Sequence, residues 1–374
     1  MRVMTVLGTR PEAIKLAPVI KALRARPGVE TTVVSTSQHR ELLRQALDVF
    51  EVTPDVDLSV MQPGQTLEEL TVRVLPAMQQ AIAAGQPDVL VVQGDTTTVF
   101  VASLAAFYQQ IPVAHVEAGL RSHHLYNPFP EEANRRLTSV LTTLHFAPTE
   151  LARQNLLREG VADAHIAVTG NTVVDALHLI SRSARFATAP LPLTIDPTRR
   201  LLLVTLHRRE SFGGALRDMC GALRQITASH PGVDVVIPVH RNPAVQDAVL
   251  EELSGVERVS LLEPLDYVTF LRIMQASYFV LTDSGGVQEE APVFGRPVLV
   301  LRETTERQEA IDAGVARLVG TKGENIVSAA AELLDDRSAY DRMARATSPY
   351  GDGHASERIA DLLMARFGHE RHVS

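Results

Sequence analysis

The feature that most constrains this chain is a double series of short apolar runs, each followed by a helical pattern. In the first half these runs predict strands near 1–7, 31–36, 88–93, 111–116, 143–147 and 165–168, and in the second half near 200–205, 233–238, 257–261, 278–282 and 297–301. Helical stretches lie between them, such as 11–26, 65–84, 97–109, 131–142, 214–229, 267–276 and 287–294. Strands that are apolar on both faces and alternate with helices form parallel sheets covered by helices. The sequence therefore predicts an α/β protein.

A proline-rich stretch divides the chain into two predicted domains. The 374 residues suffice for two domains at roughly 100–200 residues each. The stretch 184–199, ARFATAPLPLTIDPTR, contains three prolines and would make a poor helix or central strand. We expect it to link a first domain over 1–183 to a second over 200–350. A last helix over 353–367 follows the turn SPYGDG and is expected to pack back on the first domain.

Composition excludes several classes of partner. The net charge is −8, so neither nucleic acid nor an anionic membrane surface is an expected partner. The single cysteine, Cys220, lies in a helical pattern and excludes an internal disulfide; it is expected to be a small core residue. The longest apolar runs have strand length, and the chain starts directly in a strand. We expect a cytoplasmic protein.

The turn after the first predicted strand carries cations where a dinucleotide-binding chain would carry glycines. Gly8 is followed by Arg10 and Pro11, and Lys15 comes one helical turn later. Two cations beside the free N–H groups of a helix start can form an anion site. The alternative is a solvated helix start with a surface lysine.

Carboxylates follow other strands of the first half. Asp95 and Glu117 end neighbouring predicted strands of a parallel sheet, which places them at the same edge, where ligands bind in such folds. Asp95 alone could be a helix N-cap, whereas Glu117 at the end of an apolar strand needs a partner or a task. Glu131 and Glu132 open a helix, so they either stabilise its first turn or add a third carboxylate.

The second half carries a pattern typical of diphosphate binding. The segment VLTDSGGVQEEAP places Ser284, Gly285 and Gly286 between a strand and a helix, where backbone N–H groups can approach a phosphate. A glutamate one turn later can accept from ribose hydroxyls, and Arg307 follows another strand. The basic run HRRES after the first strand of this half could instead be a solvated loop. Metal-ligand spacing is absent, and Asp55 and Asp57 form only a weak D-x-D pattern.

Together these motifs resemble the non-hydrolysing UDP-N-acetylglucosamine 2-epimerase family. The matching stretches run nearly end to end: GTRPEAIKLAP, SQHRELL, MQPGQTL, QGDTTT, HVEAGLRS, PFPEEANRR, TGNTVVDAL, HRRES, PVHRNP, DSGGVQEEAP, GRPVLVLRETTERQEA and SPYGDG. One departure is Leu206, at a position where this family is expected to carry a small residue.

The resemblance implies two Rossmann-like domains of the GT-B type, with the active site in the interdomain cleft. It also implies reversible epimerisation of UDP-GlcNAc to UDP-ManNAc at C2. The family eliminates UDP to give a 2-acetamidoglucal intermediate and then adds UDP back with the opposite C2 configuration. No redox cofactor and no metal is implied, and the expected assembly is a homodimer that serves cell-surface polysaccharide biosynthesis.

The resemblance also implies roles for individual residues. The catalytic set matches Asp95, Glu117, Glu131 and His207. The substrate- and UDP-binding set matches Arg10, Lys15, His207, Phe270, Ser284, Gly285, Gly286, Glu290 and Arg307. A second UDP-GlcNAc, bound as an activator, would use Gln38, Gln65, Glu131, Arg208 and His240.

Three alternatives remain open at this point. A hydrolysing relative would use much the same groups and release ManNAc and UDP. A retaining UDP-sugar glycosyltransferase shares the architecture, but it would not need three carboxylates in the first domain. A catalytically dead UDP-sugar sensor should have lost those carboxylates, and all three are present.

Overall fold

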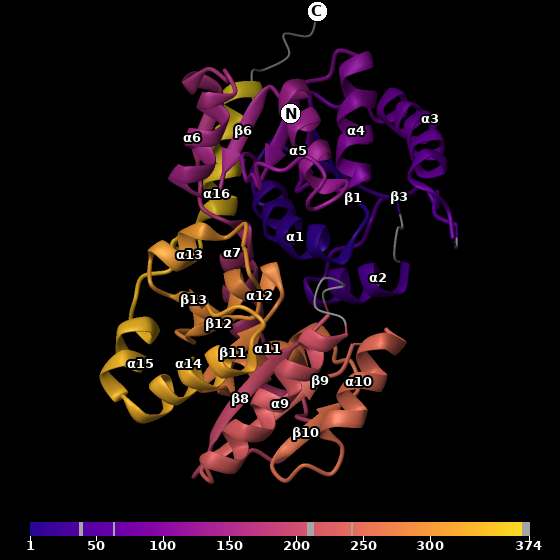
Figure 1. The fold of residues 1–374 in the computed structure, drawn as a ribbon. Helices are drawn as coiled ribbons and strands as arrows, with labels where there is room; N and C mark the ends of the chain where they lie inside the picture. The colour runs from indigo at the N-terminus through magenta and orange to yellow at the C-terminus, as the bar shows by residue number, and fades with distance from the viewer. Residues whose placement is uncertain (37–39, 63, 208–212, 241, 369–374) are drawn as a thin grey trace, which may run out of the picture. The chain divides into compact units, whose positions relative to one another are not determined.

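The computed structural model describes residues 1–36, 40–62, 64–207, 213–240 and 242–368. It divides into two compact units, one formed by Met1–Ile180 with Tyr350–Ser374 and the other by Ser181–Pro349. Each unit contains one parallel sheet with helices packed on it (Figure 1). The α/β prediction is therefore confirmed.

The sheet of the first unit has seven strands in the order β3-β2-β1-β4-β5-β6-β7, and its strand pairs are parallel. The strands are β1 (Arg2–Leu7), β2 (Glu30–Ser35), β3 (Val56–Asp57), β4 (Val89–Gln93), β5 (Val113–Val116), β6 (Leu144–Ala147) and β7 (Ile166–Val168). The order reverses direction at β1, so the crevice between the carboxyl ends of β1 and β4 is the topological switch point, where ligands bind in open α/β sheets.

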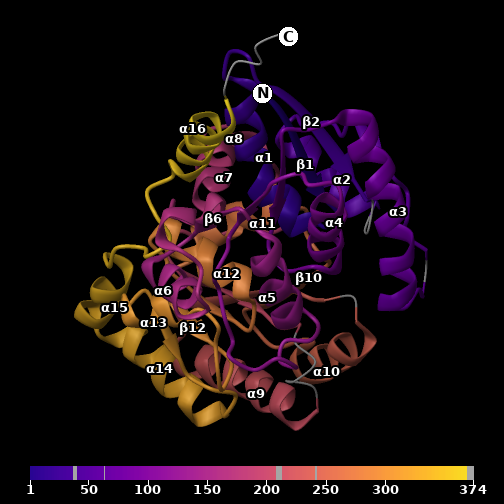
Figure 2. The ribbon, with the colours of Figure 1, turned by 90° about the horizontal axis from the view of Figure 1, so that it is seen from above.

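The helices of the first unit are α1 (Arg10–Arg24), α2 (Arg40–Val49), α3 (Leu67–Gly85), α4 (Thr97–Tyr108), α5 (Glu131–Leu141), α6 (Glu150–Arg158), the 3₁₀ turn η1 (Asp163–His165), α7 (Thr172–Ser181) and α16 (Ala355–Phe367). Helix α4 packs between α3 and α5, and α3 lies beside α4 in both Figure 1 and Figure 2. Helix α1 packs against α2 and α16. The last helix is tied to this unit by the Asp175 carboxylate, which accepts from the Ser356 N–H at 2.7 Å.

The sheet of the second unit has six parallel strands in the order β10-β9-β8-β11-β12-β13. The strands are β8 (Arg200–Thr205), β9 (Val233–Pro238), β10 (Val259–Leu262), β11 (Phe279–Thr282), β12 (Val298–Val300) and β13 (Ala316–Leu318). The helices are α8 (Ala184–Thr188), α9 (Gly214–Ser229), α10 (Pro243–Leu253), α11 (Tyr267–Ala276), α12 (Gly285–Glu290), η3 (Ala291–Phe294), α13 (Gln308–Asp312), α14 (Gly323–Asp335) and α15 (Arg337–Ala344). The switch point of this sheet lies between β8 and β11.

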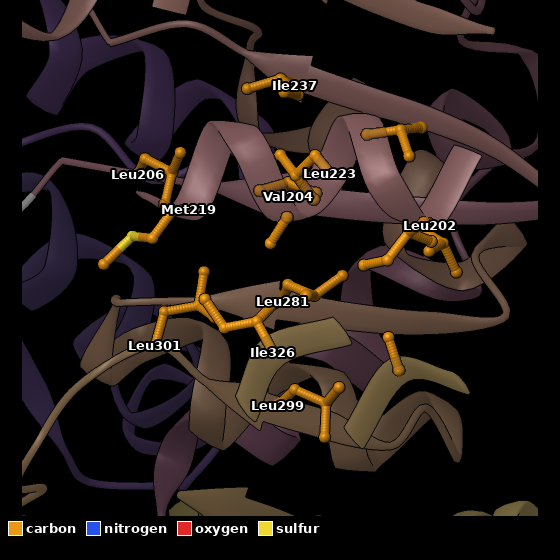
Figure 3. Close-up of a cluster of buried hydrophobic side chains, with 14 of the residues drawn as sticks. Leu202, Val204, Leu206, Met219, Leu223, Ile237, Leu281, Leu299, Leu301 and Ile326 are labelled. Atoms are coloured by element: carbon orange, nitrogen blue, oxygen red, sulfur yellow. The ribbon is translucent and has the colours of Figure 1, made fainter. Parts of the chain in front are cut away.

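One hydrophobic core of the second unit is formed by one face of its sheet and by side chains of α9, α10, α14 and α15, and Figure 3 shows part of it. Leu206, which departs from the expected small residue, is 3% exposed and belongs to this core. Cys220 is also buried there, as predicted, and burial raises the pKa of its thiol to about 12. Leu206 therefore fills core volume, and Cys220 is an unreactive packing residue.

Three elements differ from the prediction. Strands β3 and β13 were not predicted, because their segments, Val-Asp and Ala-Arg-Leu, each contain a charged residue and form no continuous apolar run. Helix α8 lies inside the stretch 184–199, which was predicted to be a poor helix. Its formation follows from two local features: the Ser183 hydroxyl accepts from the Phe186 N–H at 3.1 Å, and the Phe186 side chain is buried.

Candidate functional site

The turn after β1 is closed so tightly that only glycine fits at its start. A Cβ built on Gly8 would lie 2.3 Å from the Thr36 hydroxyl oxygen and 3.0 Å from that of Thr98. The backbone then enters α1 at Arg10, with Pro11 as the second helical residue rather than the first. This places Arg10 at the helix start, as predicted.

The Glu12 side chain is buried beneath this turn, with 2% of its surface exposed. Its Oε2 accepts from the backbone N–H groups of Gly8 at 2.5 Å and Thr9 at 2.9 Å, and its Oε1 accepts from the Thr96 hydroxyl at 2.6 Å. Burial raises the pKa of Glu12 to about 7, and the nearby charge of Asp95 adds to this rise, although the three hydrogen bonds oppose it. The sequence identified Glu12 only as a first-turn carboxylate.

A chain of alternating charges connects the ends of β1, β4 and β5. The Lys15 ammonium pairs with Glu117, and the Arg135 guanidinium pairs with Asp95 and lies 3.5 Å from Oε1 of Glu117. Arg135 also donates to the backbone carbonyl of Glu117 at 2.7 Å. The structure thus brings together three predicted residues, Lys15, Asp95 and Glu117, and adds Arg135 at their centre.

Burial distinguishes the two carboxylates in this series of ion pairs, Glu117 and Asp95. The side chain of Glu117 is 6% exposed, whereas that of Asp95 is 29% exposed. Glu117 also has a left-handed backbone with φ of 64°, a conformation that costs a non-glycine residue about 1–3 kcal/mol and gathers at functional sites. Glu117 is therefore a buried, rigidly held carboxylate, and Asp95 is the more accessible of the two.

The peptide groups around Asp95 are fixed from two further sides. The Asn134 side chain donates to the Asp95 carbonyl at 3.0 Å, and the His115 ring lies with Nε2 2.7 Å from the Gly94 carbonyl. Burial, with the charge of Arg135, lowers the pKa of His115 to about 3, so its ring is neutral and donates to this carbonyl. Glu131 is the first residue of α5 and is half-buried, one helical turn before Arg135.

In the second unit, His207 follows β8 and lies against a buried carboxylate. The side chain of Asp283 is fully buried at the end of β11; its Oδ2 accepts from the His207 N–H at 2.8 Å, and its Oδ1 lies 2.6 Å from Nδ1 of the ring. The His207 side chain is 36% exposed. Asp283 therefore holds the ring by Nδ1 and directs Nε2 away from the strand, an orientation that suits proton transfer or hydrogen bonding.

The Ser-Gly-Gly segment begins α12 at the same switch point. Ser284 is the N-cap, and its N–H donates to the Thr282 hydroxyl at 2.9 Å. Gly286 is exposed, and a Cβ built there would lie 4.0 Å from the Ser284 hydroxyl oxygen, its nearest neighbour. A Cβ built on Gly285 would lie 3.0 Å from Oε1 of Glu306. Gly285 therefore permits the Glu306 side chain to approach the start of this helix closely.

Arg307, predicted as a phosphate partner, is engaged with carboxylates. Its Nε donates to Oε1 of the fully buried Glu289 at 2.7 Å, and its Nη1 lies 3.4 Å from Oε1 of Glu306. Burial favours the neutral form of Glu306, but the charges of Arg307 and Arg302 outweigh it and lower the pKa of Glu306 to about 2. Arg307 thus pairs with one fully buried and one partly buried carboxylate, and its role toward a phosphate stays a prediction.

Glu290 and Phe270 lie on neighbouring elements of this unit. The Tyr267 hydroxyl donates to Oε1 of the buried Glu290 at 2.7 Å, which fixes the orientation of that carboxylate. Phe270 lies on α11, one turn after Tyr267, and is half-buried.

The residues predicted for a second UDP-GlcNAc are only partly within the described chain. Gln38 and Arg208 lie outside the described residues. Gln65 accepts from the Gln62 N–H at 2.8 Å, so its amide stabilises the turn before α3. The His240 ring lies 6.0 Å from that of His207 between centroids, and burial together with the charge of His207 lowers its pKa.

Two other kinds of feature are absent from the described residues. No group of three or more His, Cys, Asp or Glu among them could hold a metal ion. No helix in the described part of the chain is long and apolar enough to cross a membrane.

Four residues of these sites were not predicted as site residues from the sequence: Glu12, Arg135, Asp283 and Glu289. Each lies inside a quoted motif, and Asp283 and Glu289 directly precede the predicted residues Ser284 and Glu290. A charged residue at a strand end or in the buried stripe of a helix needs a partner. Asp283 could have been identified in this way, because it ends the apolar segment VLTD. For Arg135 the partner is 40 residues away in the sequence, so only the fold identifies it.

Comparison with known proteins identifies relatives over nearly the whole chain. A family model described as UDP-N-acetylglucosamine 2-epimerase matches residues 21–364. The UDP-N-acetylglucosamine 2-epimerase of Escherichia coli K12 is 51% identical over 372 residues, which covers 97% of this chain and 98% of the relative. The crystal structure of UDP-GlcNAc 2-epimerase from Neisseria meningitidis bound to UDP-GlcNAc is 45% identical, with a TM-score of 0.92 over 98% of this chain and 100% of that one. The enzyme of Methanocaldococcus jannaschii, in complex with UDP-GlcNAc and UDP, is 32% identical, with a TM-score of 0.81 over 98% of this chain and 100% of that one.

Proposed function

This chain belongs to the UDP-N-acetylglucosamine 2-epimerase family, and we propose that it interconverts UDP-GlcNAc and UDP-ManNAc without net hydrolysis. The fold of its relatives, two Rossmann-like units of the GT-B type, is shared over nearly the full chain. The specific proposal is that UDP leaves the sugar and then returns to it, whereas in the hydrolysing reaction water would take its place.

The proposed reaction has two balanced stages. A base removes the C2 proton, the C–H electron pair becomes the C1–C2 double bond, and the C1–O bond breaks with its electrons leaving on UDP. The products of this stage are 2-acetamidoglucal and UDP. In the second stage an acid delivers a proton to the opposite face of C2, and a UDP oxygen attacks C1. The configuration at C2 is thereby inverted, and no external oxidant, reductant or water is consumed.

The observation that carries this proposal is the chain of alternating charges in the first unit. Proton transfer at C2 needs carboxylates with fixed positions, and Asp95 and Glu117 are joined through Arg135. Lys15 pairs with Glu117 from the other side. Glu131, one helical turn before Arg135, is the third carboxylate that we assign to this chemistry. The three carboxylates argue against a catalytically dead sensor.

The second unit is proposed to bind UDP. His207, oriented by Asp283, can donate from Nε2 to a phosphate oxygen when its ring carries a proton on both nitrogens, and the N–H groups of the Ser284–Gly286 segment favour negative charge. Glu290, held by Tyr267, is proposed to accept from the ribose hydroxyls, and Phe270 to contact the uracil. Arg10 and Lys15 are proposed to add positive charge toward the diphosphate, and Arg307 to contact a phosphate in addition to its pairs with Glu289 and Glu306.

Three further proposals rest on the family resemblance. A second UDP-GlcNAc would act as an activator through Gln38, Gln65, Glu131, Arg208 and His240. The assembly would be a homodimer working in the cytoplasm, where the single buried thiol of Cys220 stays reduced. The product would enter cell-surface polysaccharide synthesis.

The deciding experiment is incubation of the purified protein with UDP-GlcNAc in D₂O, followed by proton NMR. The proposal expects UDP-ManNAc that carries deuterium at C2, with deuterium also entering the UDP-GlcNAc pool. Free ManNAc and stoichiometric UDP would instead establish the hydrolysing reaction. Unchanged UDP-GlcNAc, with and without added acceptor sugars, would refute both epimerase assignments.

A further inference from the structure

We propose that Glu12 is a positioning residue that couples the turn after β1 to Asp95, and so sets the geometry of both groups for the epimerisation. The inference rests on the proposed function, because it assigns Asp95 to chemistry at C2. Glu12 itself is buried beneath the turn and is not expected to touch the substrate.

The first step of the argument is the distribution of the Glu12 hydrogen bonds. One carboxylate oxygen accepts from Gly8 at 2.5 Å and Thr9 at 2.9 Å, which belong to the turn after β1. The other oxygen accepts from the Thr96 hydroxyl at 2.6 Å, which belongs to the turn after β4. A single carboxylate therefore bridges the two strand ends that form the switch point of this sheet.

The second step is the position of Thr96. It directly follows Asp95 and is the N-cap of α4, where its hydroxyl oxygen accepts from the Val99 N–H at 3.3 Å. The hydroxyl proton is therefore directed to Glu12, and the orientation of the peptide between residues 95 and 96 is fixed. Arg135 and Asn134 hold Asp95 from the opposite side. A movement of Glu12 would accordingly change the distance between Asp95 and the turn.

The third step concerns charge. A charged group that acts on Glu12 from another element is Asp95, which follows β4, and Arg10 and Lys15 lie on the same helix as Glu12. Among these, Asp95 disfavours the charged form of Glu12, and the two backbone donors favour it. Burial places the pKa of Glu12 at about 7, so its protonation changes within the range where the enzyme would work. Protonation would remove one of the acceptor sites on which the bridge depends.

The chain offers a matched control. Helix α3 begins with the same Thr-x-x-Glu arrangement as α1: the Thr66 hydroxyl accepts from the Glu69 N–H at 3.3 Å, and the Glu69 carboxylate accepts from the Thr66 N–H at 3.0 Å. Glu69 is exposed. Substitution of Glu69 therefore measures the loss of a helix cap alone, without the bridge to a second strand end.

The experiment compares Glu12→Gln and Glu69→Gln in the D₂O assay, with calorimetric titration of UDP and thermal unfolding. Glutamine keeps the size of the side chain but presents an NH₂ group to at least one of the three donors. Glu12→Gln should lower turnover about tenfold or more while UDP affinity stays within about threefold, and the ionisation near pH 7 should disappear from its kcat/KM profile. Glu69→Gln should change none of these.

A double-mutant cycle tests the route through Thr96. Thr96→Val should lower turnover, Thr96→Ser should restore it, and the double variant Glu12→Gln/Thr96→Val should be no slower than the slower single variant. Parental turnover in Glu12→Gln, or a loss of turnover with no change in the pH profile, would overturn the inference while leaving the proposed function intact. A parent protein that introduces no deuterium at C2 would overturn both.

Discussion

Each unit holds a carboxyl group beside a helix start, and the two groups are charged differently. At the β1–β4 switch point of the first unit, a buried carboxyl, Glu12, accepts from neutral donors, and its pKa rises to about 7. In the loop between β12 and α13 of the second unit, the partly buried carboxyl Glu306 lies between Arg302 and Arg307, and its pKa falls to about 2. Burial acts in the same direction on both groups, so the cations decide the sign.

The difference indicates that the two units have different roles. A carboxyl whose pKa lies near neutrality belongs with proton transfer, because small changes around it alter its charge. A carboxyl held ionised by two guanidinium groups provides a fixed charge that shapes a binding surface. The first unit therefore has the electrostatics of a proton-transfer site, and the second has those of a rigid ligand-binding site. The five predictions that follow test this contrast.

The largest effect is expected from the carboxylates of the first unit. Asp95→Asn and Glu117→Gln should each lower turnover by ~10²–10⁴, because a positioned acid or base contributes about that factor. UDP affinity should stay near the parental value, as measured by calorimetry. Because Glu117→Gln removes the carboxylate that pairs with the buried Lys15, its fold should be checked by circular dichroism. Near-parental turnover in both variants would show that these carboxylates are structural.

In the second unit, the effect of removing a charged side chain should appear in the stability of the protein. Arg307→Ala leaves Glu289, which is fully buried, without its cation, so the free energy of unfolding should fall by ~3–5 kcal/mol. Adding Glu289→Gln should recover part of this loss in urea denaturation. Arg153→Ala is the control: it removes an exposed pair with Asp163 and should cost at most ~1 kcal/mol. Equal losses in the two single variants would contradict the fixed-charge interpretation.

Glu12 should give the stability of the protein a specific pH dependence. Its native pKa of about 7 exceeds the ordinary value of 4.5, so between these values the native state holds a proton that the unfolded chain has released. The Glu12 contribution to the free energy of unfolding is therefore largest below about pH 4.5, falls as the pH rises to about 7 and is then constant, a change of about 3 kcal/mol. Between pH 4.5 and 8, the free energy of unfolding of the parent should therefore fall by this amount relative to that of Glu12→Gln. Parallel curves would contradict the burial argument.

Asp283→Asn should slow turnover by up to ~10²-fold, because an amide no longer fixes the Nδ1–H form of the His207 ring. Asp234→Asn, which alters a partly exposed pair with Arg199 in the same unit, is the matched control and should leave turnover unchanged. Parental turnover in Asp283→Asn would remove His207 from the reacting groups.

The smallest effect is expected from removal of cofactors. Incubation with EDTA and with charcoal should leave turnover within about twofold, because the proposed elimination needs neither a metal nor a redox group. Turnover that is lost and then restored by Mg²⁺ or NAD would require a different mechanism for the first unit.

Much of the fold was predictable from the sequence, because strands and helices depend on local apolar patterns. The strand-end placement of Asp95, Glu117, His207 and Ser284 followed from the same patterns, since each residue directly follows an apolar run. The resemblance to a known family added roles for these residues. The edge strands β3 and β13 were missed because each is short and contains a charged residue, Asp57 or Arg317, so no apolar run marks it.

What the sequence determined by itself is which polar residues stand at which strand ends. What only the tertiary structure decided is how they are paired and buried. Arg135 lies 40 residues from Asp95, and Glu12 lies 84 residues from Thr96, so neither contact has a local signature. The physical reason is that a pKa depends on solvent exposure and on charges within a few ångströms. Both are set by the packing of crossover helices against a sheet rather than by neighbours along the chain.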